Sequence, residues 1–128
     1  MSDKPAAQKL LLKQGYTFLL LNPPKGYSAR MGKLPPKVKV LTAPGEPADV
    51  IQVFYSTQAE LEKDLAALKP ALKPRGVLWI TYPKGTSRLA SDLNRDTIWK
   101  FAATVGLAAV AIFSVDEDWS ALRLKLAP

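Results

Sequence analysis

Side chains that could bind an anion follow one of the buried hydrophobic runs. The run Val77–Tyr82 is typical of a strand that is buried on both faces. A polar loop comes directly after it, and the candidate ligand-binding residues here are Tyr82, Lys84, Thr86, Ser87 and Arg88. Open α/β sheets bind ligands at the carboxyl ends of their strands, so these cations and hydroxyls could hold an anionic group there. The alternative is a plain polar loop that leads to the next helix.

A second cation comes close to that loop in the expected fold. Asp92-Leu93-Asn94-Arg95-Asp96 opens a helix predicted from about Asp92 to Val105. Acidic side chains suit the start of a helix, and one of them can cap it, so a structural role is expected for this segment. Arg95 lies one turn into the helix and could face the same edge of the sheet as Lys84.

An acidic turn, Asp116-Glu117-Asp118, precedes Trp119 and joins two strands that must be antiparallel. Asp116 and Asp118 could bind a hard cation through oxygen atoms, but two carboxylates on a tight turn are more often solvated or paired, and no metal is expected. Trp119 could offer a flat stacking surface to a ligand. Packing in the core is the alternative.

The loop after the first strand supplies two further candidates, Asn22 and Lys25. Gly26 to Lys33 has the outline of a phosphate-binding loop, but five residues separate its glycines where four are needed. Leu34 also stands where a magnesium-binding hydroxyl would be required. We therefore assign no phosphate-binding loop here.

Two residue types are absent, and their absence excludes whole chemistries. The chain has no Cys and no His. Disulfides, thiolate nucleophiles, Cys/His zinc sites and every Ser–His or Cys–His arrangement are therefore excluded. No catalytic residue is assigned from the sequence.

The elements that must position these side chains alternate in type. Short apolar runs predict strands at 16–21, 37–41, 50–55, 77–82, 107–115 and 121–126. Leu61, Leu65, Leu68 and Leu72 share one helical face, and Thr57 with Glu60 has the spacing of a capping box. Residues 73–76 are expected to end that helix. A short helix at 27–31 and the helix at 92–105 complete a mostly parallel α/β sheet of about six strands with an antiparallel C-terminal hairpin.

The chain from 12 to 126 resembles a small bacterial family of unknown function that has an abbreviated class I methyltransferase-like fold. The resemblance rests on Leu19-Leu20-Leu21-Asn22, Tyr82-Pro83-Lys84-Gly85-Thr86-Ser87, Asp92-Leu93-Asn94-Arg95-Asp96 and Val115-Asp116-Glu117-Asp118-Trp119-Ser120. Leu68–Ile80 also resembles the helix-to-strand passage of methyltransferases. The resemblance implies the fold and brings no established activity with it.

The cofactor that such a fold would take is S-adenosylmethionine, and the sequence departs from what its binding requires. None of the seven glycines stand two apart, so no G-x-G loop exists. The strand at 37–41 is followed by Thr42-Ala43-Pro44, without an acidic residue to bind a ribose. We therefore expect no cofactor.

The net charge of +7 lies entirely in the first third of the chain. Residues 1–39 hold eight basic residues against one acidic residue, whereas residues 40–128 hold ten of each. Such asymmetry can mark a nucleic-acid contact, and its alternative is a set of solvated lysines. No signal segment or membrane span is evident, so a cytoplasmic protein without membrane contact is expected.

These observations predict a flexible terminus at 1–8 and one domain at 9–128. The function expected is a non-catalytic methyltransferase-like module that binds a macromolecule or an anionic ligand at the carboxyl-end loops. One alternative is a divergent transferase or other small enzyme acting on an anionic substrate. The other is a nucleic-acid-binding protein that uses the basic first third. The sequence does not indicate an oligomeric state.

Overall fold

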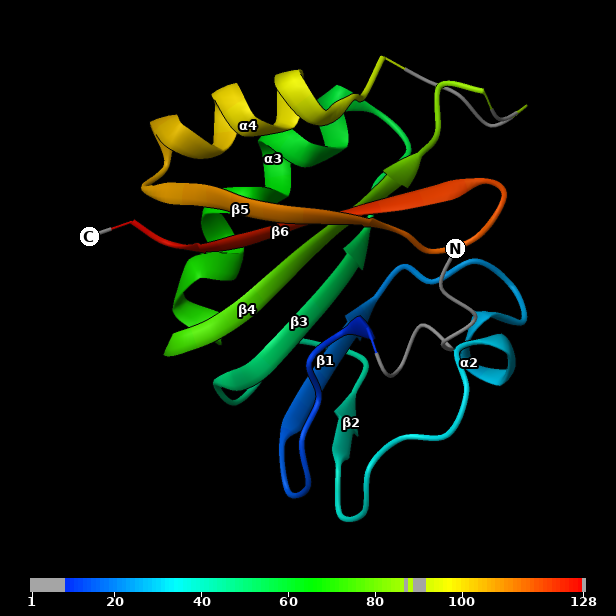
Figure 1. Ribbon diagram of the computed structural model, residues 1–128. Helices are drawn as coiled ribbons and strands as arrows, with labels where there is room; N and C mark the ends of the chain where they lie inside the picture. The colour runs from blue at the N-terminus through cyan, green and yellow to red at the C-terminus, as the bar shows by residue number, and fades with distance from the viewer. Residues whose placement is uncertain (1–8, 87, 89–91, 128) are drawn as a thin grey trace.

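The computed structural model describes residues 9–86, 88 and 92–127, so the terminus predicted to be flexible at 1–8 lies outside the described residues. Strands and helices alternate along the chain (Figure 1). They are β1 Thr17–Leu21, α2 Tyr27–Arg30, β2 Lys39–Leu41, β3 Ala48–Phe54, α3 Gln58–Leu68, the 3-10 turn η1 Lys69–Ala71, β4 Leu72–Pro83, α4 Arg95–Thr104, β5 Leu107–Ser114 and β6 Trp119–Leu126.

The strands form one six-stranded sheet in the order β2-β1-β3-β4-β6-β5. The first four pair in parallel, and β6 runs antiparallel to both β4 and β5. The predicted fold class is therefore confirmed. Because β1, β3 and β4 are parallel, they end at one edge of the sheet, where β6 begins. We call this the carboxyl edge, formed by residues 22–25, 55–57, 84–86 and 115–118.

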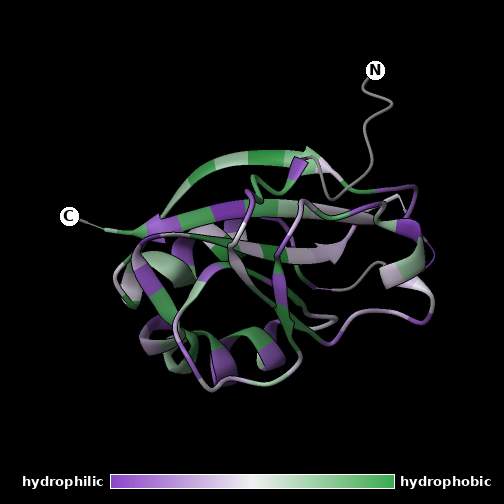
Figure 2. Ribbon diagram, turned by 90° about the horizontal axis from the view of Figure 1, so that it is seen from below, coloured by the Kyte–Doolittle hydropathy of each residue, from purple (hydrophilic) through white to green (hydrophobic). Residues whose placement is uncertain are grey.

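Each face of the sheet packs against its own cover. Helices α3 and α4 lie together on one face, and Leu61, Leu65 and Ile98 are fully buried there (Figures 1 and 2). The segment before β1 and helix α2 cover the other face, where Leu10 and Tyr27 pack. Burial on both faces explains why the central strands are continuous apolar runs.

The beginnings of the two long helices are set by side-chain caps. Thr57 accepts from the Glu60 amide and Glu60 reaches back, so the predicted capping box is confirmed. The second helix begins at Arg95 and not at Asp92. Its cap is Asn94, whose side chain accepts from the Thr97 amide at 3.0 Å.

The segment around Leu72 differs from its prediction. Helix α3 ends at Leu68, and Pro70 stands in the first turn of η1. Leu72 opens the twelve-residue strand β4, so residues 73–76 belong to a strand and do not end a helix. Leu72 is nonetheless buried beside Leu68, which explains why it fitted the helical pattern.

In the part of the chain that the structure describes, no helix has both the length and the apolarity that crossing a membrane demands.

Candidate functional site at the carboxyl edge

The chain turns sharply where β1 ends. Asn22 has a left-handed backbone, with φ of 55°, and Gly26 also lies in that region, with φ of 80°. The Asn22 amide donates to the Phe54 carbonyl at 3.4 Å, which ties the turn to the end of β3. Lys25 is exposed on the same turn, and its side chain forms no ion pair or hydrogen bond with the described residues.

The loop after β4 and the acidic turn lie side by side. Pro83 pairs with Trp119 in the sheet, and the Lys84 amide donates to the Asp118 carbonyl at 2.7 Å. The Lys84 ammonium donates to the Ser114 hydroxyl. Thr86 and Arg88 are exposed beyond this contact, and Ser87 lies outside the described residues. These two loops are therefore neighbours in the structure, while their ligand-binding role stays a prediction.

The carboxylate of Asp116 is used by its own turn. Its Oδ1 accepts from the amides of Asp118 and Trp119, at 2.8 and 3.0 Å. Trp119 is only 8% exposed and meets Phe54 edge-on, with ring centroids 5.1 Å apart. A stacking surface for a ligand does not fit that covered position, so the prediction of Trp119 as a ligand-binding residue is corrected to core packing.

Tyr82 and Arg95 line one pocket of about 350 Å³ together with Asn94, Asp96 and Ile112. Burial raises the pKa of the Tyr82 phenol, although the nearby Arg95 charge and a hydrogen bond with Ser120 act in the opposite direction. The phenol therefore keeps its proton at neutral pH and can donate a hydrogen bond. Arg95 is exposed at the start of α4, and its Nε lies 3.7 Å from the Asp96 carboxylate in the same lining.

An apolar groove of about 300 Å³ continues from this pocket between α4 and the strands β5 and β6. Arg95, Asp96 and Ile112 line both spaces. The groove adds Trp99, which is 55% exposed, and Val110, which is 46% exposed. Large apolar side chains with this exposure, beside a pocket that holds the Arg95 guanidinium and the Asp96 carboxylate, suit a ligand that has both a polar and an apolar part.

A buried chain of polar side chains, not predicted from the sequence, lies beneath this edge. The Tyr27 hydroxyl donates to Gln52 Oε1 at 2.9 Å, and Gln52 Nε2 donates to Thr81 Oγ1 at 3.1 Å. Gln52 and Thr81 are fully buried, and Tyr27 is 2% exposed. The signal that could have revealed the chain is Gln52 itself, a polar residue inside the apolar run at 50–55.

Tyr55, directly after β3, is a second residue that was not predicted from the sequence. It is 1% exposed, and its hydroxyl has no hydrogen-bond partner among the described residues. Burial raises the pKa of this phenol, and the charges of Asp64 and Glu60 raise it further. The described residues contain no group of three or more acidic, His or Cys side chains that could hold a metal ion.

Comparison with known proteins identifies the fold. No family model matches the chain, and no curated protein matches it in sequence. A TehB-like SAM-dependent methyltransferase from Corynebacterium glutamicum is similar in structure, with a TM-score of 0.62 and 14% identity over 98% of this chain and 89% of that one.

Two further solved structures agree. A SAM-dependent methyltransferase from Aquifex aeolicus has a TM-score of 0.60 and 18% identity over 91% of this chain and 85% of that one. The 1,6-didemethyltoxoflavin-N1-methyltransferase from Burkholderia thailandensis, solved with 1,6-didemethyltoxoflavin and S-adenosylhomocysteine, has a TM-score of 0.61 and 10% identity over 90% of this chain and 72% of that one. The chain therefore has the fold of class I SAM-dependent methyltransferases.

This finding corrects the function expected from the sequence. The prediction of a non-catalytic module rested on the missing G-x-G loop and on the lack of His and Cys. Several of the solved structures that share the fold over 90% or more of this chain are methyltransferases, so the fold gives no support to a non-catalytic module. The methyltransferase-like part of the resemblance is confirmed, and membership of the uncharacterised bacterial family stays a prediction.

Proposed function

We propose that this chain is a divergent transferase that binds S-adenosylmethionine at the carboxyl edge and acts on an anionic substrate. The observation that carries the proposal is the fold, which several SAM-dependent methyltransferases share over most of their own length. One of them was solved with S-adenosylhomocysteine. When bound, the cofactor would supply an activated methyl group.

The turn after β1 resembles a glycine-rich cofactor-binding loop in its backbone conformation and differs from one in its backbone donors. Glycine-rich loops provide left-handed backbone conformations that bring the chain close to a ligand, and here Asn22 and Gly26 adopt them. Pro23 and Pro24 remove two backbone donors from the same turn. Binding would therefore use side-chain donors, of which Asn22 and Lys25 are the nearest on the turn.

The substrate would occupy the pocket of Tyr82 and Arg95 and the adjoining groove. Arg95 attracts an anionic group, and the protonated Tyr82 phenol donates a hydrogen bond to it. Trp99 and Val110 contact the apolar part of the substrate in the groove. The work of Tyr82 and Arg95 is therefore to bind and orient the substrate.

Titration calorimetry tests the cofactor. S-adenosylmethionine and S-adenosylhomocysteine are each expected to bind the wild-type protein and to bind Asn22→Ala at least several-fold more weakly. If neither compound gives heat or raises the melting temperature of the wild-type protein, the cofactor assignment is wrong.

Two variants that each remove one positive charge from α4 test the substrate pocket. Arg95→Ala should abolish methyl transfer to any anionic acceptor found in a screen with labelled cofactor. Lys100→Ala removes the same charge from an exposed position of α4 outside the pocket and should leave transfer unchanged. Equal loss in both variants would mean that only the overall charge of the helix matters. A cytoplasmic location, and a protein or nucleic-acid partner for the basic first third, remain predictions.

A further inference from the structure

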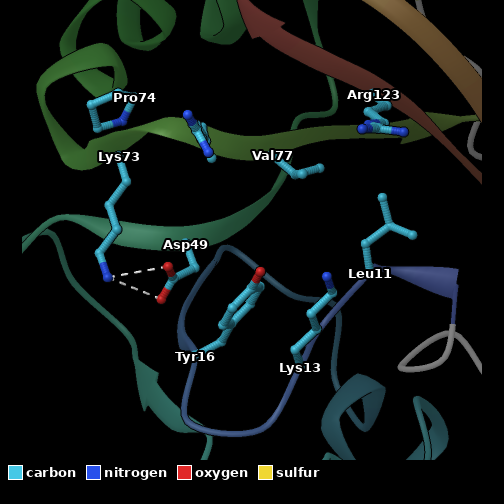
Figure 3. A pocket seen from close by; sticks show the side chains of 10 residues that line it. Leu11, Lys13, Tyr16, Asp49, Lys73, Pro74, Val77 and Arg123 are labelled. Carbon is cyan, nitrogen blue, oxygen red and sulfur yellow. Dashed lines mark hydrogen bonds and ion pairs between the residues drawn. The ribbon is translucent and has the colours of Figure 1, made fainter.

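A basic cavity of about 570 Å³ lies at the opposite end of the sheet, where β3 and β4 begin (Figure 3). We call it the amino-edge cavity. Its polar lining comprises Lys13, Tyr16, Asp49, Lys73, Arg75 and Arg123. Its volume lies within the range of small-molecule sites, which is roughly 300–1,000 Å³. It shares no residue with the pocket of Tyr82 and Arg95, so what it binds is independent of the proposed function.

A bulge in β4 builds one wall of the cavity. Ala48 pairs with Leu72 and Val50 pairs with Val77, so two steps along β3 are matched by five steps along β4. The extra residues belong to the segment 73–76, where Pro74 lacks the amide that a regular ladder would use. The interruption brings Lys73 and Arg75 to the cavity lining. Bulges of this kind re-aim side chains beside functional sites.

The single carboxylate in the lining is already neutralised. Asp49 lies 3.1 Å from the Lys73 ammonium and also accepts from the Thr17 amide at 2.8 Å. This pairing leaves Lys13, Arg75 and Arg123 without an ion pair to any described residue. The cavity therefore presents three uncompensated positive charges.

Arg123 gives the cavity a buried donor that the described residues do not satisfy. Its side chain extends from β6, and its Nε is buried with no hydrogen-bond partner among the described residues. A buried donor on a charged group is costly to leave unpaired, so such a group is normally satisfied by protein, water or ligand. Figure 3 shows Lys13 and Tyr16 extending from the segment before β1 toward β4, with Arg123 across the cavity beside Leu11.

We propose that the amino-edge cavity binds a small phosphorylated molecule. Arg75 and Arg123 can each offer planar paired donors to a phosphate group, Lys13 adds a mobile charge, and the Tyr16 hydroxyl adds a neutral donor. Leu11 and Val77 form apolar walls for the part of the molecule that carries the phosphates. The three free cations match the negative charge of a diphosphate better than they match that of a single carboxylate.

Titration calorimetry with inorganic pyrophosphate on the whole chain tests this site. Pyrophosphate should bind the wild-type protein, and Arg123→Gln and Arg75→Ala should each weaken binding by about tenfold or more, because each removes a charge-assisted contact. Lys125→Ala is the matched control, since it removes one positive charge from an exposed position of β6 outside the cavity. It should change affinity by less than about twofold.

Arg75 is exposed, so Arg75→Ala keeps the test valid if Arg123→Gln fails to fold. The proposal is overturned if pyrophosphate does not bind, or if Lys125→Ala weakens it as much as Arg75→Ala does. It is also overturned if a single-stranded oligonucleotide binds more tightly than pyrophosphate and depends on the same residues, because the ligand would then be a polymer. Unchanged pyrophosphate binding in Asn22→Ala and Arg95→Ala separates this outcome from that of the proposed function.

Discussion

At the scale of single residues, the buried polar groups beneath the carboxyl edge are the least expendable. Gln52 sits in the middle of β3, and both ends of its amide are satisfied, one by Tyr27 and the other by Thr81. A buried polar atom that loses its partner costs about 1–3 kcal/mol, so the three side chains hold one another in a single arrangement. That arrangement fixes α2, and with it the turn that carries Lys25, against β3 and β4.

The Tyr27 phenol should make the free energy of unfolding fall at alkaline pH. Burial raises the pKa of Tyr27 to about 12 from its ordinary value of 10.0. Between those values the unfolded chain loses the phenol proton while the folded chain keeps it, so the folded state binds more protons and the free energy of unfolding falls as pH rises. Each such phenol contributes about 1.4 kcal/mol per pH unit in that window.

Urea unfolding at a series of pH values between 9 and 12 measures this effect. Below pH 10 the stabilisation linked to the proton should be fully present, and above it the wild-type curve should fall more steeply than that of Tyr27→Phe. Parallel curves for the two proteins would show that the phenol titrates normally.

At the scale of elements, features that depend on neighbouring residues were predicted well, and features that depend on long-range contacts were not. Thr57 and Glu60 form the predicted capping box because a helix start depends on four neighbouring residues. At the second helix, Asp92 is drawn away from the cap, since its carboxylate accepts from the Gln58 amide at 2.8 Å, and Asn94 takes its place. That long-range contact joins residues 34 positions apart, which no local pattern contains.

The start of β4 and the two ends of the sheet show the same limit. The prediction that Pro74 and Gly76 end a helix is wrong, because whether such residues end a helix or lie in a strand bulge depends on pairing with β3. Tyr82 and Arg95 could be placed at one edge from strand order alone. The amino-edge cavity could not, because Lys13, Arg75 and Arg123 come from three elements whose register only the folded sheet defines.

Removing the cap of α4 should affect both stability and the pocket. Asn94→Ala deletes the acceptor for the Thr97 amide and is expected to lower the free energy of unfolding by about 1 kcal/mol. Because Arg95 is the first residue of the helix, the same change should loosen its position and weaken any anion bound beside Tyr82. Chemical denaturation measures the first effect and calorimetry the second. Asn94→Asp, which restores an acceptor, should recover most of both; no recovery would contradict the capping role.

At the scale of the whole molecule, charge is distributed between the two ends of the sheet. The parallel strands separate the carboxyl edge, with Lys84 and Arg95, from the amino-edge cavity, with Lys13, Arg75 and Arg123. Several acidic side chains interact with nearby groups. Asp49 pairs with Lys73, Glu46 pairs with Lys39, and Asp116 accepts hydrogen bonds within its own turn. The net charge of +7 weakens the folded state through self-repulsion.

Salt should relieve that repulsion, and a bound anion should do more. Raising sodium chloride to about 0.15 M shortens the screening distance to about 8 Å, so the melting temperature should rise modestly. Pyrophosphate at the same ionic strength should raise it further, because binding to the folded state alone adds stability in proportion to the logarithm of ligand concentration. Arg75→Ala should keep the response to chloride and lose most of the response to pyrophosphate. If both salts act equally on the wild-type protein at matched ionic strength, the charge is only screened, and the cavity does not recognise phosphate.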